Sequence, residues 1–417
     1  MAIKLLIGGS PCTHWSIAQK NNRETEPEGL GWELFENYLI AKAKFKPDFF
    51  LYENNKSASQ AIKNQVAKEL GVGTDSDTRF TYINSALVSA QNRQRFYVTN
   101  FGDIEQPEDR GILLKDILET GCDIEQPMIN HTQRGLIADK PIRVGCMPSP
   151  DGTIKNSQAM RVYSFEGKSV NLISQGGGLG AKTGLYAIPV NITKDGKSQT
   201  IKAQYQQTSP MNIVAYTSTY GASGVAEPVG YATAIEWDKK GIPTKAISCA
   251  DGKVYTVYEV KDGFITIKGK QYPIELENGY YIIRKLTVKE CCRLQTLPDD
   301  YCKAVSNCQA YKGIGNGWTA EVIIHLLNHA LKDVPRDEEI IVLSMYDGIG
   351  TGRYCLNKMG FTNVKYYAYE IDKFPITIAL DNYPDIVQCG DAFQVRDDMW
   401  QPPLTRSEWL DELLGGA

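Results

Sequence analysis

The strongest constraint on this chain is a local pattern found at both of its ends: a short apolar run that stops at glycine or an acidic residue, near a stretch with helical spacing. Near the N-terminus, the apolar runs cover residues 4–7, 49–52 and 95–100, and helical spacing covers 30–43 and 57–70. After residue 340 the pattern returns, with runs that end at Met345, at Glu370 and at Gly390-Asp391. Strands that alternate with helices predict a mixed, mostly parallel α/β sheet with helices on both faces.

The middle of the chain has a different character. Short alternating runs at 254–260, 264–268 and 272–276 are separated by Asp-Gly, Gly-Lys and Asn-Gly turns, which indicates a β-rich module. Helical spacing resumes at 287–294 and 319–331, and residues 333–337 resemble a linker. We therefore predict a first part of the α/β domain over 1–120, a β-rich domain over 121–300, and a second part of the α/β domain over 301–417.

Composition excludes several classes of protein. The ten cysteines include no CxxC pair and there are four histidines, so neither structural zinc nor a disulfide scaffold is expected. The sequence holds no run of eighteen apolar residues and no signal peptide pattern, so we expect a cytoplasmic protein with no membrane partner. The net charge is -4, but residues 121–285 hold 19 Lys+Arg and 14 Asp+Glu. This local excess of +5 is compatible with phosphate contact.

The C-terminal strand ends carry residues of the kind that bind nucleotides. Glycines at 348, 350 and 352 follow the run at 340–345, and such a loop allows a tight turn and offers a helix N-terminus to a ligand. Glu370 and Asp391 stand at the next two strand ends, where an acidic side chain can bind ribose. These features predict a nucleotide-type cofactor, and they do not by themselves separate NAD from S-adenosyl-L-methionine.

The N-terminal strand ends carry groups for covalent and acid–base chemistry. Cys12 follows Pro11 in a glycine-rich loop, and Glu53 follows the apolar run at 49–52. Both are expected at one edge of the sheet, where they can act on one substrate. Arg93 and Arg95 stand just before the next strand, as a pair able to grip a phosphate or a base.

Together these blocks resemble the cytosine-C5 DNA methyltransferases. The Pro-Cys block with a serine four residues later matches Pro11, Cys12 and Ser16, and the Glu-Asn-Val block matches Glu53-Asn54. The other matches are QxRxR at Gln91, Arg93 and Arg95, RxLTxxExxRLQ from Arg284 to Gln295, Gly315-Asn316, and the cofactor blocks at Tyr346–Gly350, Glu370-Ile371 and Gly390-Asp391. The resemblance implies a Rossmann-like S-adenosylmethionine-dependent methyltransferase fold with a β-rich target-recognition domain.

The order of the blocks differs from that of most members of this family. Here the Pro-Cys block comes first and the cofactor blocks come last. The resemblance therefore implies a circularly permuted member, similar to phage and bacterial enzymes and to the catalytic domain of animal de novo DNA methyltransferases. A phage-infected or bacterial cell is the expected setting.

The resemblance also implies the role of each site residue. Cys12 would attack C6 of a cytosine flipped out of double-stranded DNA, Glu53 would contact N3, and Arg93 and Arg95 would fix the base and backbone. S-adenosyl-L-methionine would be held by Tyr346, Asp347, Gly348, Ile349, Gly350, Thr351, Glu370, Ile371, Asp391, Pro11, Asn316 and Trp318.

Three other functions compete with this interpretation. Methylation of RNA uses the same chemistry, but the signature Cys-Phe-Thr of the tRNA-methylating branch is absent from the sequence. A silent DNA-binding regulator would keep the fold but would usually have lost some of the catalytic residues. Here Cys12, Glu53 and Arg93 are all present. An NAD-dependent oxidoreductase leaves the Pro-Cys block unexplained. The sequence departs from the family at Asn55, which replaces valine, and at His14 and Trp15 beside the cysteine.

Overall fold

The computed structural model describes residues 2–11, 13–16, 23–120, 140–174, 179–190 and 231–408. Cys12 lies outside these residues. The chain divides into two compact units. The first unit comprises residues 1–88, 93–109 and 295–417, and the second comprises 89–92 and 110–294. The domain bounds that the sequence analysis gives, at residues 120 and 300, stay a prediction.

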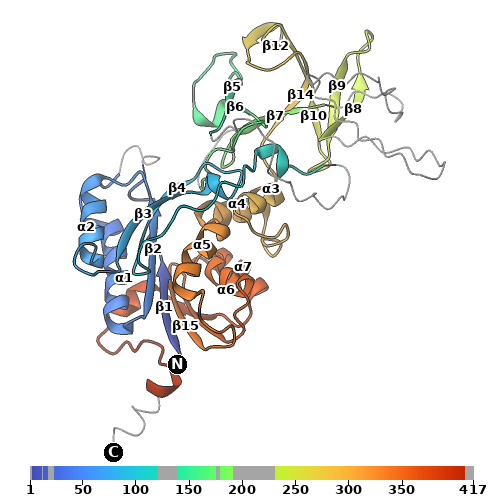
Figure 1. Cartoon of the computed structure of the whole chain (residues 1–417). Coiled ribbons are helices and arrows are strands. Elements are labelled where there is room, and N and C mark those ends of the chain that lie inside the picture. The colour runs from blue at the N-terminus through green and yellow to red at the C-terminus, as the bar shows by residue number, and fades with distance from the viewer. Residues whose placement is uncertain are drawn as a thin grey trace, which may run out of the picture. The chain divides into compact units, whose positions relative to one another are not determined.

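The first unit is built on a seven-stranded sheet with the order β17-β16-β15-β1-β2-β4-β3 (Figure 1). The strands are β1 Ile3–Gly8, β2 Phe49–Asn55, β3 Arg79–Asn84, β4 Gln94–Thr99, β15 Ile340–Met345, β16 Val364–Tyr369 and β17 Val387–Gly390. All neighbours are parallel except that β4 runs antiparallel to β2 and β3. The predicted mostly parallel sheet is confirmed.

Helices cover both faces of this sheet. They are α1 Leu30–Phe45, α2 Gln60–Leu70, α4 Asn307–Asn316, α5 Ala320–Leu331, α6 Thr351–Lys358 and α7 Lys373–Asn382. In Figure 1, α1 and α2 lie on one side of the sheet, and α5, α6 and α7 lie on the other. The central strand β15 is buried at every position, as expected for a parallel strand covered on both faces.

The register of the central strands brings three strand ends together. Gly8, the last residue of β1, pairs with Met345 of β15 and with Tyr52 of β2. The turn after β1, the end of β2 and the glycine loop after β15 therefore meet at the carboxyl edge of the sheet. Open α/β sheets bind ligands at this edge, where the strand order reverses.

The two ends of the described chain also meet. Lys4 in β1 forms an ion pair with Glu408, with 2.8 Å between Nζ and Oε1. The strand that follows residue 339, β15, is the direct neighbour of β1, the strand that begins the chain. The sheet is thus assembled from an early and a late segment that lie side by side.

The second unit is built mainly from strands. One sheet has the order β13-β12-β11-β14-β7-β6-β5 and the other has the order β10-β9-β8. Their bounds are β5 Arg143–Cys146, β6 Arg161–Ser164, β7 Leu185–Pro189, β8 Ala232–Trp237, β9 Pro243–Ser248, β10 Val254–Thr256, β11 Tyr258–Lys261, β12 Phe264–Ile267, β13 Lys270–Pro273 and β14 Gly279–Arg284, with the helix α3 Val288–Leu294.

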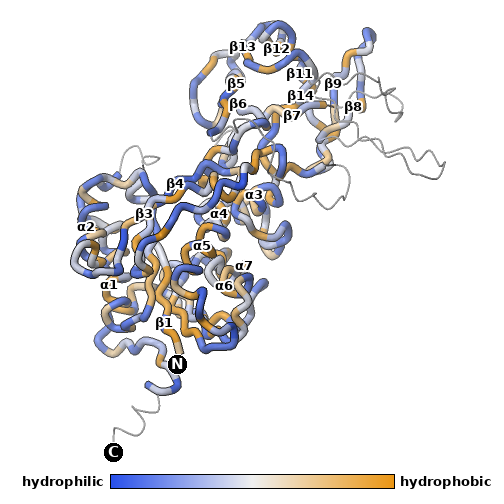
Figure 2. Tube along the Cα trace, in the orientation of Figure 1, coloured by the Kyte–Doolittle hydropathy of each residue, from blue (hydrophilic) through white to orange (hydrophobic). Residues whose placement is uncertain are grey.

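The burial of the strands differs between the two units. In β12 and β13 one residue each, Ile265 and Tyr272, is buried between exposed neighbours, whereas β1 is mostly apolar and buried along nearly its whole length (Figure 2). Alternation is the pattern of an antiparallel sheet with one face in solvent.

Several predicted bounds were wrong. The strand predicted to stop at Tyr52 continues to Asn55, so Glu53 lies within β2 and pairs with Tyr97 of β4. The run at 254–260 forms two strands, β10 and β11. The strand β3 and the helix α4 were missed, because partly polar residues weaken their periodicity.

Two observations bear on partners. Among the described residues, no cluster of His, Cys, Asp or Glu has the make-up of a metal site. The described helices include none that is long and apolar enough to cross a membrane.

Candidate functional site

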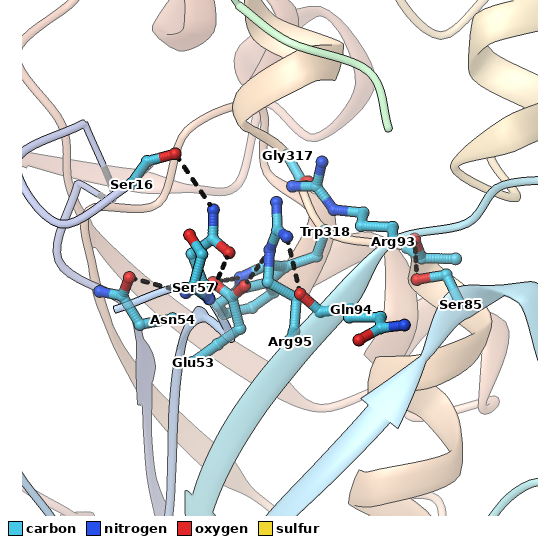
Figure 3. Close-up of polar contacts among 12 residues, drawn as sticks. Ser16, Glu53, Asn54, Ser57, Ser85, Arg93, Gln94, Arg95, Gly317 and Trp318 are labelled. Carbon is cyan, nitrogen blue, oxygen red and sulfur yellow. Dashed lines mark hydrogen bonds and ion pairs between the residues drawn. The ribbon is translucent and has the colours of Figure 1, made fainter. Parts of the chain in front are cut away.

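Glu53 is held by two donors at the carboxyl edge of the first unit's sheet (Figure 3). Its Oε1 lies 2.9 Å from Nε of Arg95 on the neighbouring strand β4. Its Oε2 accepts a hydrogen bond of 3.1 Å from the indole nitrogen of Trp318. The side chains of Glu53 and Arg95 are 13% and 6% exposed, so this carboxylate is largely shielded from water.

The turn that leads to Cys12 lies directly against Glu53. A side chain at Gly9 would collide with the carbonyl oxygen of Glu53, so the close approach of the two strand ends requires glycine here. The next residue, Ser10, is buried and its hydroxyl lies 2.7 Å from the hydroxyl of Tyr52. Asn54 donates to the Ser10 carbonyl at 3.0 Å. This network fixes the backbone up to Pro11, which is exposed.

The residues after Cys12 are anchored to the start of α1. Glu24 accepts hydrogen bonds from the Gly31 amide and from the Trp15 indole, and it pairs with His14 at 3.3 Å. Trp15 is fully buried. His14 and Trp15, two of the residues that differ from the family pattern, therefore contact Glu24. Asn55, which stands where the family has valine, donates a hydrogen bond of 3.4 Å to Ser16.

Arg93 does not point toward Glu53 but toward the C-terminal end of α4 and the residue that follows this helix. Its guanidinium donates to the carbonyls of Gly315 at 3.3 Å and Gly317 at 2.8 Å, and the residue is buried. Arg95 lies beside Glu53 instead. The two arginines of the QxRxR block thus hold different parts of the site.

The glycine loop after β15 begins with a strained backbone. Tyr346 has φ 61°, in the left-handed region, and its hydroxyl donates to the Leu34 carbonyl of α1 at 2.7 Å. Gly348 and Gly350 also have positive φ, and Gly350 directly precedes α6. No described residue lies within 4 Å of a side chain built on Gly348, so its face is open to a ligand.

Asp347 is a half-buried acid within this loop, and its carboxylate points inward. Its Oδ1 accepts hydrogen bonds from Tyr366 at 2.6 Å and Ser344 at 2.7 Å. Its Oδ2 is buried and has no partner among the described residues. Burial raises the pKa of Asp347 to about 6; the bonds from Tyr366 and Ser344 lower it, and nearby Glu370 raises it. An unpaired buried carboxylate oxygen fits a ligand that carries positive charge.

The next two strand ends supply further polar groups. Glu370 accepts from the Gly348 amide at 3.1 Å and from the Ile371 amide at 2.8 Å, so it ties the glycine loop to the end of β16. Ile371 is 73% exposed, which is unusual for an isoleucine and fits packing against a flat ring. Asp391 is exposed and caps the short helix that follows, through Phe393.

The remaining predicted residues lie near the same loop. Ile349 is buried and its carbonyl accepts from Tyr301. Thr351, the first residue of α6, is buried and its hydroxyl has no partner among the described residues. Asn316 is the exposed last residue of α4.

Sequence reasoning missed the residues that support these groups. Tyr366 and Ser344 hold Asp347, and Ser10 with Tyr52 steadies the turn before Cys12. These side chains lie inside or beside apolar strand runs. A hydroxyl within a fully buried run was the available signal, because a buried hydroxyl requires a partner.

The chain is also similar to known proteins. The family model for C-5 cytosine-specific DNA methylase matches residues 1–332. The orphan methyltransferase M.SPRI of Bacillus phage SPR is 24% identical, over 76% of this chain and 80% of its own length. The orphan methyltransferase M.Rho11sI of Bacillus phage rho11s is 23% identical, over 80% and 86%.

Two solved structures are also similar to this chain. The Entamoeba histolytica methyltransferase EhMeth is 10% identical, with a TM-score of 0.37, over 79% of this chain and 78% of that one. The S. pombe Dnmt2 methyltransferase is 11% identical, with a TM-score of 0.33, over 79% and 77%.

Proposed function

Because the chain belongs to the C-5 cytosine-specific DNA methylase family, we propose that it transfers a methyl group from S-adenosyl-L-methionine to C5 of a cytosine in double-stranded DNA. The observation that carries this proposal is the position of Glu53. It is a shielded carboxylate, held by Arg95 and Trp318, directly beside the turn that leads to Cys12.

The glycine loop has the groups that S-adenosyl-L-methionine requires. This ligand carries a positively charged sulfonium and ammonium, and Asp347 offers a buried oxygen that has no partner among the described residues. Gly348 leaves open space, Glu370 reaches the loop, and Ile371 exposes an apolar surface for the adenine. When bound, S-adenosyl-L-methionine supplies a methyl group that is bonded to sulfur and open to nucleophilic attack.

The chain's own residues prepare the cytosine for this attack. The Cys12 thiolate adds to C6, and the electron density moves to C5, which becomes nucleophilic. As the thiolate adds, the Glu53 carboxyl passes a proton to N3, so no net negative charge is left on the ring, and Arg95 stabilises the carboxylate that results. The proton returns to Glu53 when C5 attacks the methyl group. After C5 has taken the methyl group, loss of the C5 proton restores the double bond to C6 and releases the Cys12 sulfur.

A cytosine inside a duplex cannot reach Cys12, so it must be flipped out, at a cost of about a few kcal/mol. We assign recognition of the DNA to the second unit, because its strands β8–β14 fall in the locally basic segment 121–285. Contacts with phosphates weaken as salt rises.

The proposal is tested by mapping 5-methylcytosine at base resolution. The purified protein is incubated with S-adenosyl-L-methionine and, separately, with unmethylated genomic DNA or unmodified tRNA, and a reaction without methyl donor is the control. Methylation of DNA at one short sequence is the expected result. Methylation of tRNA alone would move the function to RNA, and no methylation of either would favour a silent DNA-binding protein.

We also propose that the chain is a circularly permuted member of its family. The proposal is supported by the adjacency of β1 and β15 and by the ion pair of Lys4 with Glu408. A single short connection between the ends would place β15 before β1 in the chain without moving either strand.

A variant that joins residue 417 to residue 1 by a short Gly-Ser linker, and opens the chain between Lys332 and Asp333, tests this proposal. Both residues at the new opening are exposed. The variant is expected to fold and to keep its activity to within about one order of magnitude, because native contacts stay intact. Opening the chain between Leu5 and Leu6 of β1 is the control expected to destroy the fold. If both variants failed, the permutation proposal would be wrong.

The affinity for S-adenosyl-L-methionine is expected to depend on pH through Asp347. Its pKa of about 6 means that the carboxyl is mostly protonated at pH 5 and mostly ionised at pH 7, and a cationic ligand binds the ionised form. The affinity should therefore rise by about tenfold between pH 5 and pH 7. For folding without ligand the sign is opposite. The folded state holds the proton more tightly, so this group's contribution to the free energy of unfolding falls as pH rises from the ordinary pKa of 3.8 to about 6, and it stays constant above that.

Titration calorimetry at several pH values measures this dependence. The Asp347→Asn variant is the matched control, because its side chain keeps the shape and does not titrate. We expect weaker binding and a flat profile for the variant. A flat profile for the unmodified protein would show that Asp347 does not face the cationic ligand.

A further inference from the structure

We propose that Trp318 is a positioning residue for Glu53, and that its indole N–H fixes the orientation of the carboxylate that faces the base. This inference rests on the proposed methyl transfer and deepens it. Family resemblance assigns Trp318 to the cofactor. The geometry assigns it a second partner, because its Nε1 lies 3.1 Å from Oε2 of Glu53.

The two donors on Glu53 act on different oxygens. Arg95 holds Oε1 at 2.9 Å and Trp318 holds Oε2 at 3.1 Å (Figure 3). The terminal torsion of a glutamate is broad, so a carboxylate held at one oxygen still turns about that bond. The second donor removes this freedom. Each oxygen retains a further lone pair, so the carboxylate can still meet a base.

Trp318 is itself held firmly on both sides of its backbone. The Gly317 carbonyl accepts from Arg93 at 2.8 Å and from Gln295 at 3.2 Å. On the other side, the Thr319 hydroxyl donates to the Gln295 side-chain oxygen at 2.7 Å. A side chain on such a fixed backbone presents its N–H at a defined place, so less freedom is lost when it orients Glu53.

Tryptophan suits this role because its N–H is a neutral donor. A second arginine would add another positive charge and hold the carboxyl in its ionised form, whereas Glu53 must pass a proton to N3. The indole orients the carboxylate without a formal charge. The roles of the ring and of the N–H can therefore be separated by experiment. Packing against the cofactor depends on the ring, and the hydrogen bond to Glu53 depends on the N–H.

The Trp318→Phe variant removes the N–H and keeps an aromatic ring. We expect the single-turnover rate of methylation to fall by about tenfold, which corresponds to the net loss of one hydrogen bond, with the affinity for S-adenosyl-L-methionine nearly unchanged. The control is Trp400→Phe, which removes an indole N–H that donates to the Tyr369 hydroxyl, and it should leave the rate unchanged. In a Glu53→Ala background, Trp318→Phe should cause no further loss, because its partner is already absent.

The contact itself is measured by the indole resonances of the full chain labelled with ¹⁵N-tryptophan. The Trp318 signal, identified by its absence in Trp318→Phe, should shift in Glu53→Ala and stay in place in Asp103→Ala, which changes an exposed residue. This measurement is independent of methylation, so it stands even if the proposed function fails. An unshifted signal in Glu53→Ala, or an equal loss of rate and cofactor affinity in Trp318→Phe, would overturn the inference.

Discussion

A Cys12→Ala variant is expected to methylate no cytosine, while it still binds S-adenosyl-L-methionine and DNA. Cytosine C5 is a poor nucleophile, and only addition of a thiolate to C6 makes it reactive. The turn that leads to Cys12 is fixed by Ser10, Tyr52 and Asn54 beside Glu53, and alanine leaves these contacts in place. The loss should therefore appear in the chemical step alone, in single-turnover assays with a separate binding measurement.

The matched control is Cys308→Ala, which removes an exposed cysteine from α4 and should leave the activity unchanged. DNA that carries 5-fluorocytosine offers a second measurement. Fluorine at C5 cannot leave as a proton does, so the adduct with Cys12 should persist as a protein–DNA species stable to denaturation. A persistent adduct in Cys12→Ala would assign the attack to another residue.

The Glu290→Ala variant is expected to lower the stability of the second unit by about 3–5 kcal/mol, since it leaves a buried arginine without its counter-charge. Arg284 donates through both terminal nitrogens to the two oxygens of Glu290, each at 2.8 Å. Arg284 is 2% exposed and Glu290 is fully buried. Glu290 also accepts from the amides of Thr287 and Glu119, at 2.8 and 3.1 Å, so its loss leaves several donors unpaired.

Urea unfolding of the full chain, followed by circular dichroism, measures this effect. The exposed ion pair of Arg79 with Asp103 is the control, and Asp103→Ala should cause no measurable change in the urea midpoint. Replacing both Arg284 and Glu290 by apolar residues of similar size should recover part of the loss, because no buried charge then remains. A midpoint for Glu290→Ala equal to that of the unmodified chain would mean that this pair does not stabilise the fold.

The RxLTxxExxRLQ block can be recognised from the sequence, but the contacts of its residues are known only from the structure. In the structure, Arg284 and Glu290 form a buried pair within the second unit. Gln295, at the end of the same block, holds the carbonyls of Ile314 and Gly317 in the first unit. One motif therefore serves two structural purposes.

The sequence alone located most strands of the first unit and the chemistry-bearing residues near their carboxyl ends, although it ended β2 three residues too early. Apolar runs and glycines act locally: a run of six buried residues forms a strand, and a glycine is needed where φ is positive, as at Gly348 and Gly350. Because parallel strands align their carboxyl ends at one edge, the sequence also placed Glu53 near the turn of Cys12 and predicted the cofactor loop beside them.

Only the tertiary structure decided which side chains meet. Trp318 is 265 positions from Glu53, and Arg93 is 222 positions from Gly315. No local pattern encodes such pairs, because a hydrogen bond depends on positions to within a few tenths of an ångström, and packing of the whole core sets those positions. Two arginines of one motif therefore contact different partners: Arg95 contacts the Glu53 carboxylate, and Arg93 contacts the Gly317 carbonyl.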